Sequence, residues 1–273
     1  MKPYLVLEPT GRVHLESVIH PPRPPSGRSL RDALPAESLR LVLQHSLLEP
    51  RTALIGRTLD GLPWRFSLGA GRPDHLSISG PRGCGKSELL RSCLVSLCWS
   101  TSPQALGVVG IDPSGCQLGM IDRLPHARLE PVVDRRRARA LLDWLADEVR
   151  HRQLGLDRAP SMVVAVEDLA AWGGTAELES RLAWLRQFGG SVGVHVLQIT
   201  PAKSAVEPAP TAGMQLARGR EVPGRFRILG RDGVQAIQAM WLPVRDLVAC
   251  LEDIRQQAWV AGVSGSPEAC RPQ

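Results

Sequence analysis

Residues 80–87 have the types and spacing needed to hold a triphosphate. They read Gly-Pro-Arg-Gly-Cys-Gly-Lys-Ser, which fits the pattern G-x-x-x-x-G-K-S/T. Glycines let the backbone curl so that successive N–H groups point at phosphate oxygens, and a helix that starts here adds partial positive charge. The Lys86 ammonium should reach the β and γ phosphates, and the Ser87 hydroxyl should complete magnesium coordination. The predicted ligands of ATP and Mg²⁺ are therefore Gly80, Pro81, Arg82, Gly83, Cys84, Gly85, Lys86 and Ser87.

Two adjacent carboxylates supply the remaining chemistry that ATP hydrolysis requires. Glu167 and Asp168 come directly after the apolar run 162–166. One carboxylate at a strand end can hold magnesium through water, and a second can orient the attacking water. We therefore predict that both acids are catalytic residues, with Glu167 directed toward the metal ion and Asp168 toward the water. Asp112, which follows the apolar run 108–111, is a further candidate, although Asp-Pro is also a common turn sequence.

The elements expected around these residues alternate between strand and helix. A short strand over 75–79 precedes the glycine-rich turn, and apolar residues recur at helical spacing after it, as a phosphate-binding loop requires. Other apolar patterns predict strands over 108–111, 162–166 and 194–199, and helices over 134–152 and 178–188. The predicted fold class is α/β, a mainly parallel sheet flanked by helices, with a C-terminal hairpin and helix.

The chain divides into three predicted parts. Residues 1–50 are expected to be an N-terminal extension with a proline-rich linker at 21–25. Residues 51–260 are expected to form the ATPase domain, and residues 261–273 a flexible tail. Within the domain, Asp60-Gly61 and Asp232-Gly233 indicate two hairpins, over 52–68 and 225–241, and the spacing of Val244, Leu247, Val248, Leu251 and Ile254 indicates a closing helix.

Charge narrows the range of partners. The net charge is +6 and the sequence pI is about 9.4, which favours polyanions such as nucleic acid. The densest basic cluster is Arg135, Arg136, Arg137 and Arg139. Its predicted helix also carries Asp143, Asp147 and Glu148, a pattern that favours a solvated helix face over a nucleic-acid contact. Aromatic residues make up only 4% of the chain, so a base-stacking platform is not indicated.

Cysteine spacing and hydropathy indicate a cytoplasmic protein. The six cysteines show no C-x-x-C spacing, which favours free thiols in a reducing compartment over a zinc site or disulfides. No apolar stretch approaches the ~18 residues of a membrane span. The chain is therefore expected to have no membrane span of its own, while a membrane-bound partner stays compatible with the sequence.

The order of several motifs resembles the motor domain of FtsK/SpoIIIE-type DNA translocases. The resemblance covers residues 51–256 and rests on His75 to Gly80 before the phosphate-binding loop, Ile111-Asp112-Pro113, Leu124-Pro125-His126, Pro131-Val132-Val133-Asp134, the helix with Leu141, Trp144, Leu145 and Glu148, and Gly193-Val194-His195 leading to Thr200. It implies a RecA-like P-loop NTPase that assembles as a ring and pumps double-stranded DNA by ATP hydrolysis. It also implies that Thr200 is a polar sensor at the tip of a central strand.

The chain departs from the family pattern near the chemistry. The family usually has Asp before Glu where this chain has Glu167 before Asp168, and a lysine where it has Ser114. The usual glutamine and arginine after Thr200 are replaced by Pro201 and Ala202. These changes favour slow turnover. They leave two alternatives open: a degenerate ATP-binding ring subunit with little hydrolysis, and an FtsK-like ATPase of a protein secretion machine.

Overall fold

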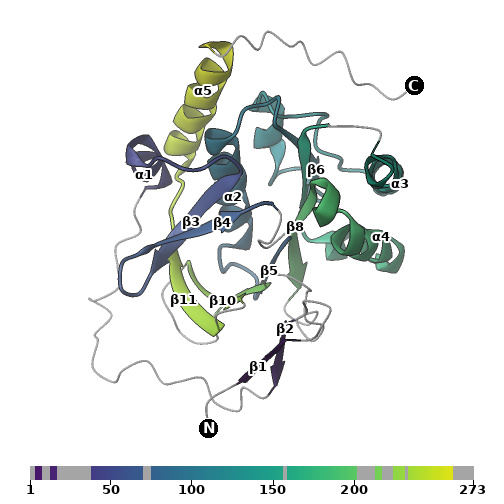
Figure 1. Ribbon diagram of the computed structural model, residues 1–273, viewed down its shortest axis with the longest axis horizontal. Helices are drawn as coiled ribbons and strands as arrows, with labels where there is room; N and C mark the ends of the chain where they lie inside the picture. Colours follow the sequence, from purple (N-terminus) through teal and green to yellow (C-terminus); the bar gives the residue numbers. More distant parts are fainter. Residues whose placement is uncertain are drawn as a thin grey trace.

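One nine-stranded sheet organises the molecule. The computed structural model describes residues 4–7, 13–16, 38–69, 75–155, 159–201, 213–216, 224–230 and 233–260. In this part of the chain the sheet has the order β4-β3-β11-β10-β9-β5-β8-β7-β6 (Figure 1). Its strands are β3 (Thr52–Thr58), β4 (Pro63–Ser67), β5 (Leu76–Gly80), β6 (Leu106–Ile111), β7 (Ser161–Val166), β8 (Val194–Pro201), β9 (Gly213–Leu216), β10 (Arg225–Gly230) and β11 (Gly233–Ala239). A separate antiparallel pair consists of β1 (Tyr4–Leu7) and β2 (Val13–Glu16).

The parallel part of the sheet carries the predicted chemistry. Neighbouring strands are parallel from β9 through β5, β8 and β7 to β6. Every residue of β6 and β7 is buried, as expected of parallel strands that helices cover on both faces. The predicted parallel α/β sheet is therefore confirmed, and the carboxyl ends of β5, β6, β7 and β8 meet at one edge.

Antiparallel strands extend the sheet beyond β9. The two predicted hairpins are present as β3 with β4 and β10 with β11, and β11 pairs with β3 to join them. Asp232, half of the second predicted turn, lies outside the described residues. Strand β9 was not expected, because the sequence pattern predicted only a loop over 201–213. It lies between β5 and β10 and connects the two parts of the sheet.

Helices cover both faces of the sheet. The helices α1 (Leu39–His45), α2 (Lys86–Ser100) and α5 (Val244–Val260) lie on one side, and α3 (Arg135–Gln153) and α4 (Ala176–Phe188) on the other (Figure 1). The described residues also form short 3-10 helices at η2 (Gly119–Arg123), η3 (Leu169–Trp172) and η4 (Gly190–Val192). Each face buries its own apolar cluster, one around α2 and one around α3 and α4. The predicted helix over 134–152 is present as α3, and it buries an apolar stripe at Ala138, Leu141, Leu142, Leu145 and Val149.

Helix α1 belongs to the main core, although the sequence placed residues 1–50 in an extension. Leu39 and Leu43 are buried in the same cluster as α2 and α5. The Leu39 amide donates a 2.8 Å hydrogen bond to the carbonyl of Trp241, just after β11. A long-range contact of this kind leaves no local sequence signal, so the boundary of the compact unit moves from residue 51 to about Ser38. The proline-rich stretch and the tail over 261–273 lie outside the described residues.

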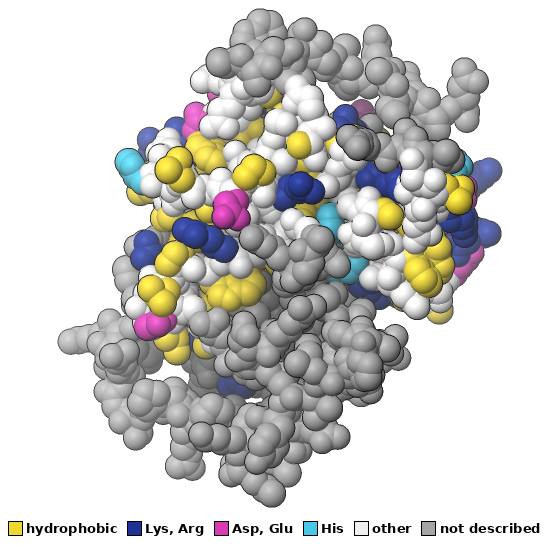
Figure 2. All heavy atoms as spheres, in the orientation of Figure 1, with side chains coloured by type: hydrophobic (Ala, Val, Ile, Leu, Met, Phe, Trp, Pro, Cys, Tyr) yellow, Lys and Arg dark blue, Asp and Glu magenta, His cyan; other side chains and the backbone are white. Residues whose placement is uncertain are grey.

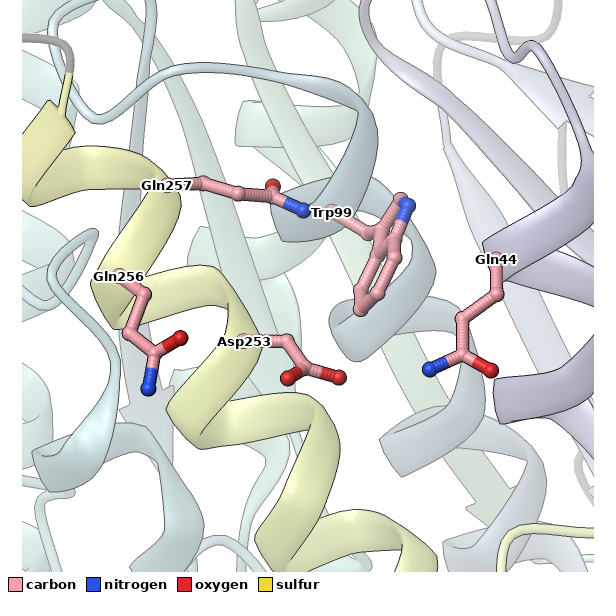
Figure 3. A pocket seen from close by; sticks show the side chains of 5 residues that line it. All are labelled: Gln44, Trp99, Asp253, Gln256 and Gln257. Carbon is pink, nitrogen blue, oxygen red and sulfur yellow. The ribbon is translucent and has the colours of Figure 1, made fainter.

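A shallow hollow of about 460 Å³ lies between α1, α2 and α5. Its lining side chains are Gln44, Trp99, Asp253, Gln256 and Gln257 (Figure 3). Trp99 is close to the last residue of α2, whereas Lys86 is the first, so the hollow lies roughly 20 Å along that helix from the glycine-rich loop. Along the described residues, no helix combines the length and the apolar character that crossing a membrane would need.

Candidate nucleotide site

The glycine-rich loop adopts the backbone that its sequence requires. Gly83 has a φ of 78° and Gly85 a φ of 93°, in the left-handed region that side chains disfavour. A Cβ added at either residue would meet no atom within 4 Å, so backbone conformation rather than lack of space calls for glycine. Gly85 is the N-cap of α2, and its carbonyl accepts a 2.9 Å hydrogen bond from the amide of Leu89. Strand β5, the loop and α2 thus follow one another as predicted.

The ammonium of Lys86 lies across this loop. Its Nζ donates hydrogen bonds to the carbonyls of Gly80, at 3.1 Å, and Pro81, at 2.9 Å. Carbonyl oxygens are weaker partners for a cation than phosphate oxygens, so an anion in the loop can replace them. Arg82 and Gly83 are exposed and Cys84 is half-buried, so the loop is open to solvent.

A direct contact joins the loop to the acidic pair. The Ser87 hydroxyl donates a 3.2 Å hydrogen bond to Oε2 of Glu167, which is 5% exposed. The other carboxylate oxygen, Oε1, is buried and has no hydrogen-bond partner among the described residues. A buried oxygen without a partner costs free energy unless a ligand satisfies it. Magnesium binds one or two carboxylates, phosphate oxygens and several waters, so these residues fit ATP and Mg²⁺.

The charge state of Glu167 reflects its surroundings. Burial raises the pKa of this carboxyl above its ordinary value, and the nearby Asp112 carboxylate adds to the rise. The hydrogen bond from Ser87 and the positive charge of Arg91 act in the opposite direction without cancelling it. A cation beside such a desolvated carboxylate strongly stabilises its charged form.

Asp112 organises the loop that follows β6. The residue is fully buried, and both oxygens accept hydrogen bonds: Oδ1 from the amide and hydroxyl of Ser114, at 3.1 and 2.6 Å, and Oδ2 from the amides of Gln117 and Leu118, at 2.7 and 2.9 Å. Burial alone would raise its pKa, but these bonds outweigh burial and lower it. Of the two interpretations that the sequence left open, this geometry favours the turn.

Asp168 is placed at the start of a tight turn. Its Oδ1 accepts a 3.0 Å hydrogen bond from the amide of Ala170, so the side chain caps η3. Unlike the buried Glu167, it is half-buried. The two acids are adjacent as predicted, and Glu167 is the one that contacts Ser87.

Thr200 lies in β8 beside the strand that leads into the glycine-rich loop. It pairs with Ser79 in the parallel ladder of β5 and β8, and it is half-buried. Pro201, opposite Gly80, ends β8, and Ala202 lies outside the described residues. Thr200 therefore lies beside the residue that precedes the glycine-rich loop, and its role as a polar sensor stays a prediction.

Two groups of polar residues near the site were not predicted. Arg91 donates a 3.0 Å hydrogen bond to Gln117 and forms an ion pair with Glu88, which ties the Asp112 loop to α2. Arg91 lies four residues after Ser87, a helical spacing that could have revealed it. On the other face of the sheet, buried Gln198 binds Arg186 and Glu179 of α4. The sequence spacing of Arg186 and Glu179 does not indicate that these residues contact β8.

Comparison with known proteins agrees with this geometry. Residues 58–210, more than half of the chain, match the model of the FtsK/SpoIIIE family. The DNA translocase SftA of Bacillus subtilis is 27% identical over 179 residues, which is 57% of this chain and 18% of SftA. The DNA translocase FtsK of Helicobacter pylori is 26% identical over 231 residues, 73% of this chain and 27% of that protein. The chain thus spans less than a third of the length of these relatives.

A solved structure shares the fold. The cytoplasmic domain of the type VII secretion ATPase EccC of Thermomonospora curvata superposes with a TM-score of 0.64 and 17% identity, covering 86% of this chain and 34% of that one. Identity this low supports the fold alone. The family match shows that the chain belongs to the FtsK/SpoIIIE family, and its RecA-like α/β fold presents an open glycine-rich loop beside the Ser87–Glu167 contact.

Proposed function

We propose that this domain binds ATP with Mg²⁺ and hydrolyses it to move double-stranded DNA, as one subunit of a ring. The observation that carries the proposal is the Ser87–Glu167 hydrogen bond, beside an open glycine-rich loop and with Oε1 of Glu167 left without a partner among the described residues. Glu167 is a buried acid that lies against the first turn of α2, which begins with Lys86 and Ser87. A magnesium ion bound between Ser87 and Glu167 would compensate the charge of this acid.

The loop residues are proposed to bind the triphosphate. Amide groups over 82–87 donate to phosphate oxygens, and the start of α2 adds partial positive charge. Lys86 exchanges the carbonyls of Gly80 and Pro81 for the β and γ phosphates. Ser87 and Glu167 hold the magnesium ion, which when bound neutralises the developing phosphate charge.

The remaining acid and the sensor are proposed to act on hydrolysis. Asp168 orients the attacking water through a carboxylate oxygen, while its Oδ1 bond to the Ala170 amide fixes the side chain. Thr200, at the end of β8, contacts the γ-phosphate. When that phosphate is released, the lost contact changes the position of the end of β8. In the reversed acid order the longer side chain, Glu167, would hold the metal ion, and a bridging water would absorb the difference in reach.

Duplex DNA is the proposed substrate because two properties favour it. The net charge of +6 suits a polyanion. Relatives that share 26–27% identity with this chain are named DNA translocases. Since the chain spans less than a third of those relatives, the ring assembly and the translocation step are inferred for the complete protein that contains this domain.

A second candidate function is an ATP-binding subunit with little hydrolysis. The bond from Ala170 occupies one oxygen of Asp168, and the reversed acid order shortens the catalytic side chain by one methylene. A displacement of about 1 Å at a reacting centre can cost about a hundredfold in rate. In this version the domain holds ATP as a switching or structural ligand beside an active partner subunit.

Phosphate release by the purified, assembled protein tests these proposals. We expect Mg²⁺-dependent ATP hydrolysis that duplex DNA stimulates and that Lys86→Ala abolishes. ATP binding without turnover, in the presence and absence of DNA, would favour the degenerate subunit. Turnover that DNA does not stimulate, from an assembly that does not bind DNA, would contradict the DNA motor and leave a protein substrate, as in a secretion machine.

A further inference from the structure

Helix α3 begins with a charge pattern that opposes its own dipole. Arg135, Arg136 and Arg137 are its first three residues, and no acidic residue lies in the first turn. The amino end of a helix carries partial positive charge, so cations there are unfavourable and acids are preferred. The capping residue Asp134 accepts a 2.9 Å hydrogen bond from the Arg137 amide and offsets only one charge. Sequences that break a local rule of this kind usually do so for function.

Acidic residues farther along the surface are already paired. The Asp143 carboxylate contacts Arg139 and Arg181, and Asp147 contacts Arg150. Glu148 pairs with Arg152, and Glu177 of α4 with Arg139 and Arg181. These ion pairs neutralise the acids that made a solvated face the favoured interpretation of the sequence. The positive charge at the start of α3 is therefore not compensated by them.

The four arginines differ in what they contact. Arg139 is used in the ion pairs with Asp143 and Glu177. Arg135 donates to the carbonyls of Gly173, at 3.3 Å, and Gly174, at 2.6 Å. Arg136 and Arg137 are exposed, and among the described residues no side-chain partner is found for either guanidinium. We call Arg136 and Arg137 the α3 arginine pair.

The α3 arginine pair lies at the sheet edge that carries the nucleotide site. Val132 pairs with Ile111 at the carboxyl end of β6, and α3 starts three residues later. Arg135 donates hydrogen bonds to the carbonyls of Gly173 and Gly174. These two glycines end the short segment that starts with Asp168. Basic side chains gather over the side of the molecule formed by α3 and α4 (Figure 2). The α3 arginine pair and the turn that carries the proposed catalytic acid therefore lie at the same edge of the sheet.

We propose that the α3 arginine pair contacts the phosphate backbone of duplex nucleic acid. Two exposed guanidinium groups at a helix amino terminus provide charge, planar donors and backbone dipoles for one phosphate strand. Such contacts carry no sequence information, so binding is insensitive to base sequence and sensitive to salt. The identity of the partner rests on the proposed DNA motor function, whereas the position of the contact rests on α3 alone.

A pair of matched double variants tests the contact. Arg136→Ala with Arg137→Ala removes the pair, and Arg245→Ala with Arg255→Ala removes the same charge from exposed positions of α5. Fluorescence anisotropy with a labelled duplex of mixed sequence measures affinity over a range of salt concentrations. We expect the α3 variant to bind about tenfold more weakly and its logarithmic salt slope to fall by about 2, one for each phosphate that is no longer neutralised. The α5 variant should change by less than about twofold, as expected of a charge outside the contact.

Each other outcome has a defined meaning. Equal losses in both variants, or no loss in either, from a parent that binds duplex would overturn the contact and leave the DNA function intact. A parent that hydrolyses ATP but binds no duplex would overturn the DNA function and the contact together. If polyglutamate binds through the α3 arginine pair and duplex does not, the surface serves an acidic protein instead, and the proposal is wrong. Unchanged melting temperatures and ATP affinity in both variants exclude a folding defect.

Discussion

The Ser87 hydroxyl donates a 3.2 Å hydrogen bond to Oε2 of Glu167, and this contact joins the first turn of α2 to the end of β7. Ser87→Ala removes a proposed magnesium ligand and the partner of a buried carboxylate. We expect ATP binding to lose its dependence on Mg²⁺, which calorimetric titrations with Mg²⁺ and with a chelator would measure. Ser180→Ala on exposed α4 is the matched control and should behave as the parent. Retained Mg²⁺ dependence in Ser87→Ala would contradict the assignment.

Lys86 carries an ammonium at the start of α2, where the loop is expected to hold the phosphates. Lys86→Ala removes an ammonium that now binds the carbonyls of Gly80 and Pro81. Hydrogen bonds to charged groups contribute about 1.5–3 kcal/mol, so ATP affinity should fall by about tenfold to a hundredfold. Lys86→Arg should also bind weakly, because a planar guanidinium does not fit where a compact ammonium is needed. Calorimetry on variants with unchanged circular dichroism would test this, and parent-like ATP affinity in Lys86→Ala would show that nucleotide binds elsewhere.

Asp168→Asn separates catalysis from structure at the acidic pair. An asparagine oxygen can still accept the hydrogen bond from Ala170, so the cap of η3 is kept while the negative charge is lost. We expect hydrolysis to disappear and ATP affinity to stay unchanged. The exchange of Glu167→Asp with Asp168→Glu should raise turnover, because it restores the family order. Steady-state phosphate release measures both, and fast turnover in Asp168→Asn would mean that another group activates the water.

Asp112→Ala should destabilise the fold. The substitution leaves the Ser114 amide and hydroxyl and the amides of Gln117 and Leu118 without their acceptor. The Leu118 amide is buried, and an unsatisfied buried donor costs about 1–3 kcal/mol, whereas the donors of exposed Ser114 can turn to water, so we expect a loss of about 2 kcal/mol. Urea unfolding would measure it, with Asp168→Asn as a control that changes stability little. A stable Asp112→Ala protein that binds ATP normally but cannot hydrolyse it would make Asp112 a catalytic candidate again.

Two buried histidines should make the fold sensitive to acid. Burial, with help from the charges of His195 and Arg186, lowers the pKa of His75 to about 3, and burial lowers the pKa of His126 to about 4. The unfolded chain titrates near 6.5, so below this pH it binds protons that the folded state does not. Stability is therefore full above about pH 6.5 and falls as pH decreases, by about 2 kcal/mol for each histidine at pH 5.

The same histidines offer a controlled test of that pH dependence. His75 accepts a 2.9 Å hydrogen bond from the Val196 amide, and asparagine can replace the acceptor without titrating. Urea unfolding at pH 7.5 and pH 5 should show a smaller difference for His75→Asn than for the parent. His45→Asn, at an exposed position, should leave the difference unchanged. Equal pH dependence in all three proteins would mean that other groups control the acid sensitivity.

The elements that carry chemistry were predictable because their signals are local. The apolar runs of β6 and β7 are buried over their whole length, and the glycines of 80–87 sit at the left-handed positions that the motif requires. Strand β9 and helix α1 were missed or misplaced for a different reason. The four residues of β9 carry a weak strand signal, and pairing with β5, distant in the sequence, decides their state, whereas the place of α1 in the core depends on its long-range contact with Trp241.

The site was predictable in its residues but less so in its contacts. Glu167 could be expected to approach Ser87, since strand ends and a phosphate-binding loop share one sheet edge. The role of Asp112 depended on where its two oxygens point, and spacing alone cannot give that direction. The Gln198 contacts with Arg186 and Glu179 depend on how α4 packs against β8, which is a tertiary property.

The order of strands has a consequence for the way the chain folds during synthesis. Strand β5, which leads into the glycine-rich loop, pairs with β8 on one side and with β9 on the other. Strand β3 pairs with β11, which is synthesised much later. Residues that the ribosome produces early therefore stay at open strand edges until residues 213–239 have emerged. Leu39 and Leu43 can pack on α2 once it has formed, but the cluster that buries them is completed only when α5 has emerged. A nascent chain stopped before residue 213 would hold the complete ATP motif on an unfinished sheet, exposed to aggregation and to chaperones.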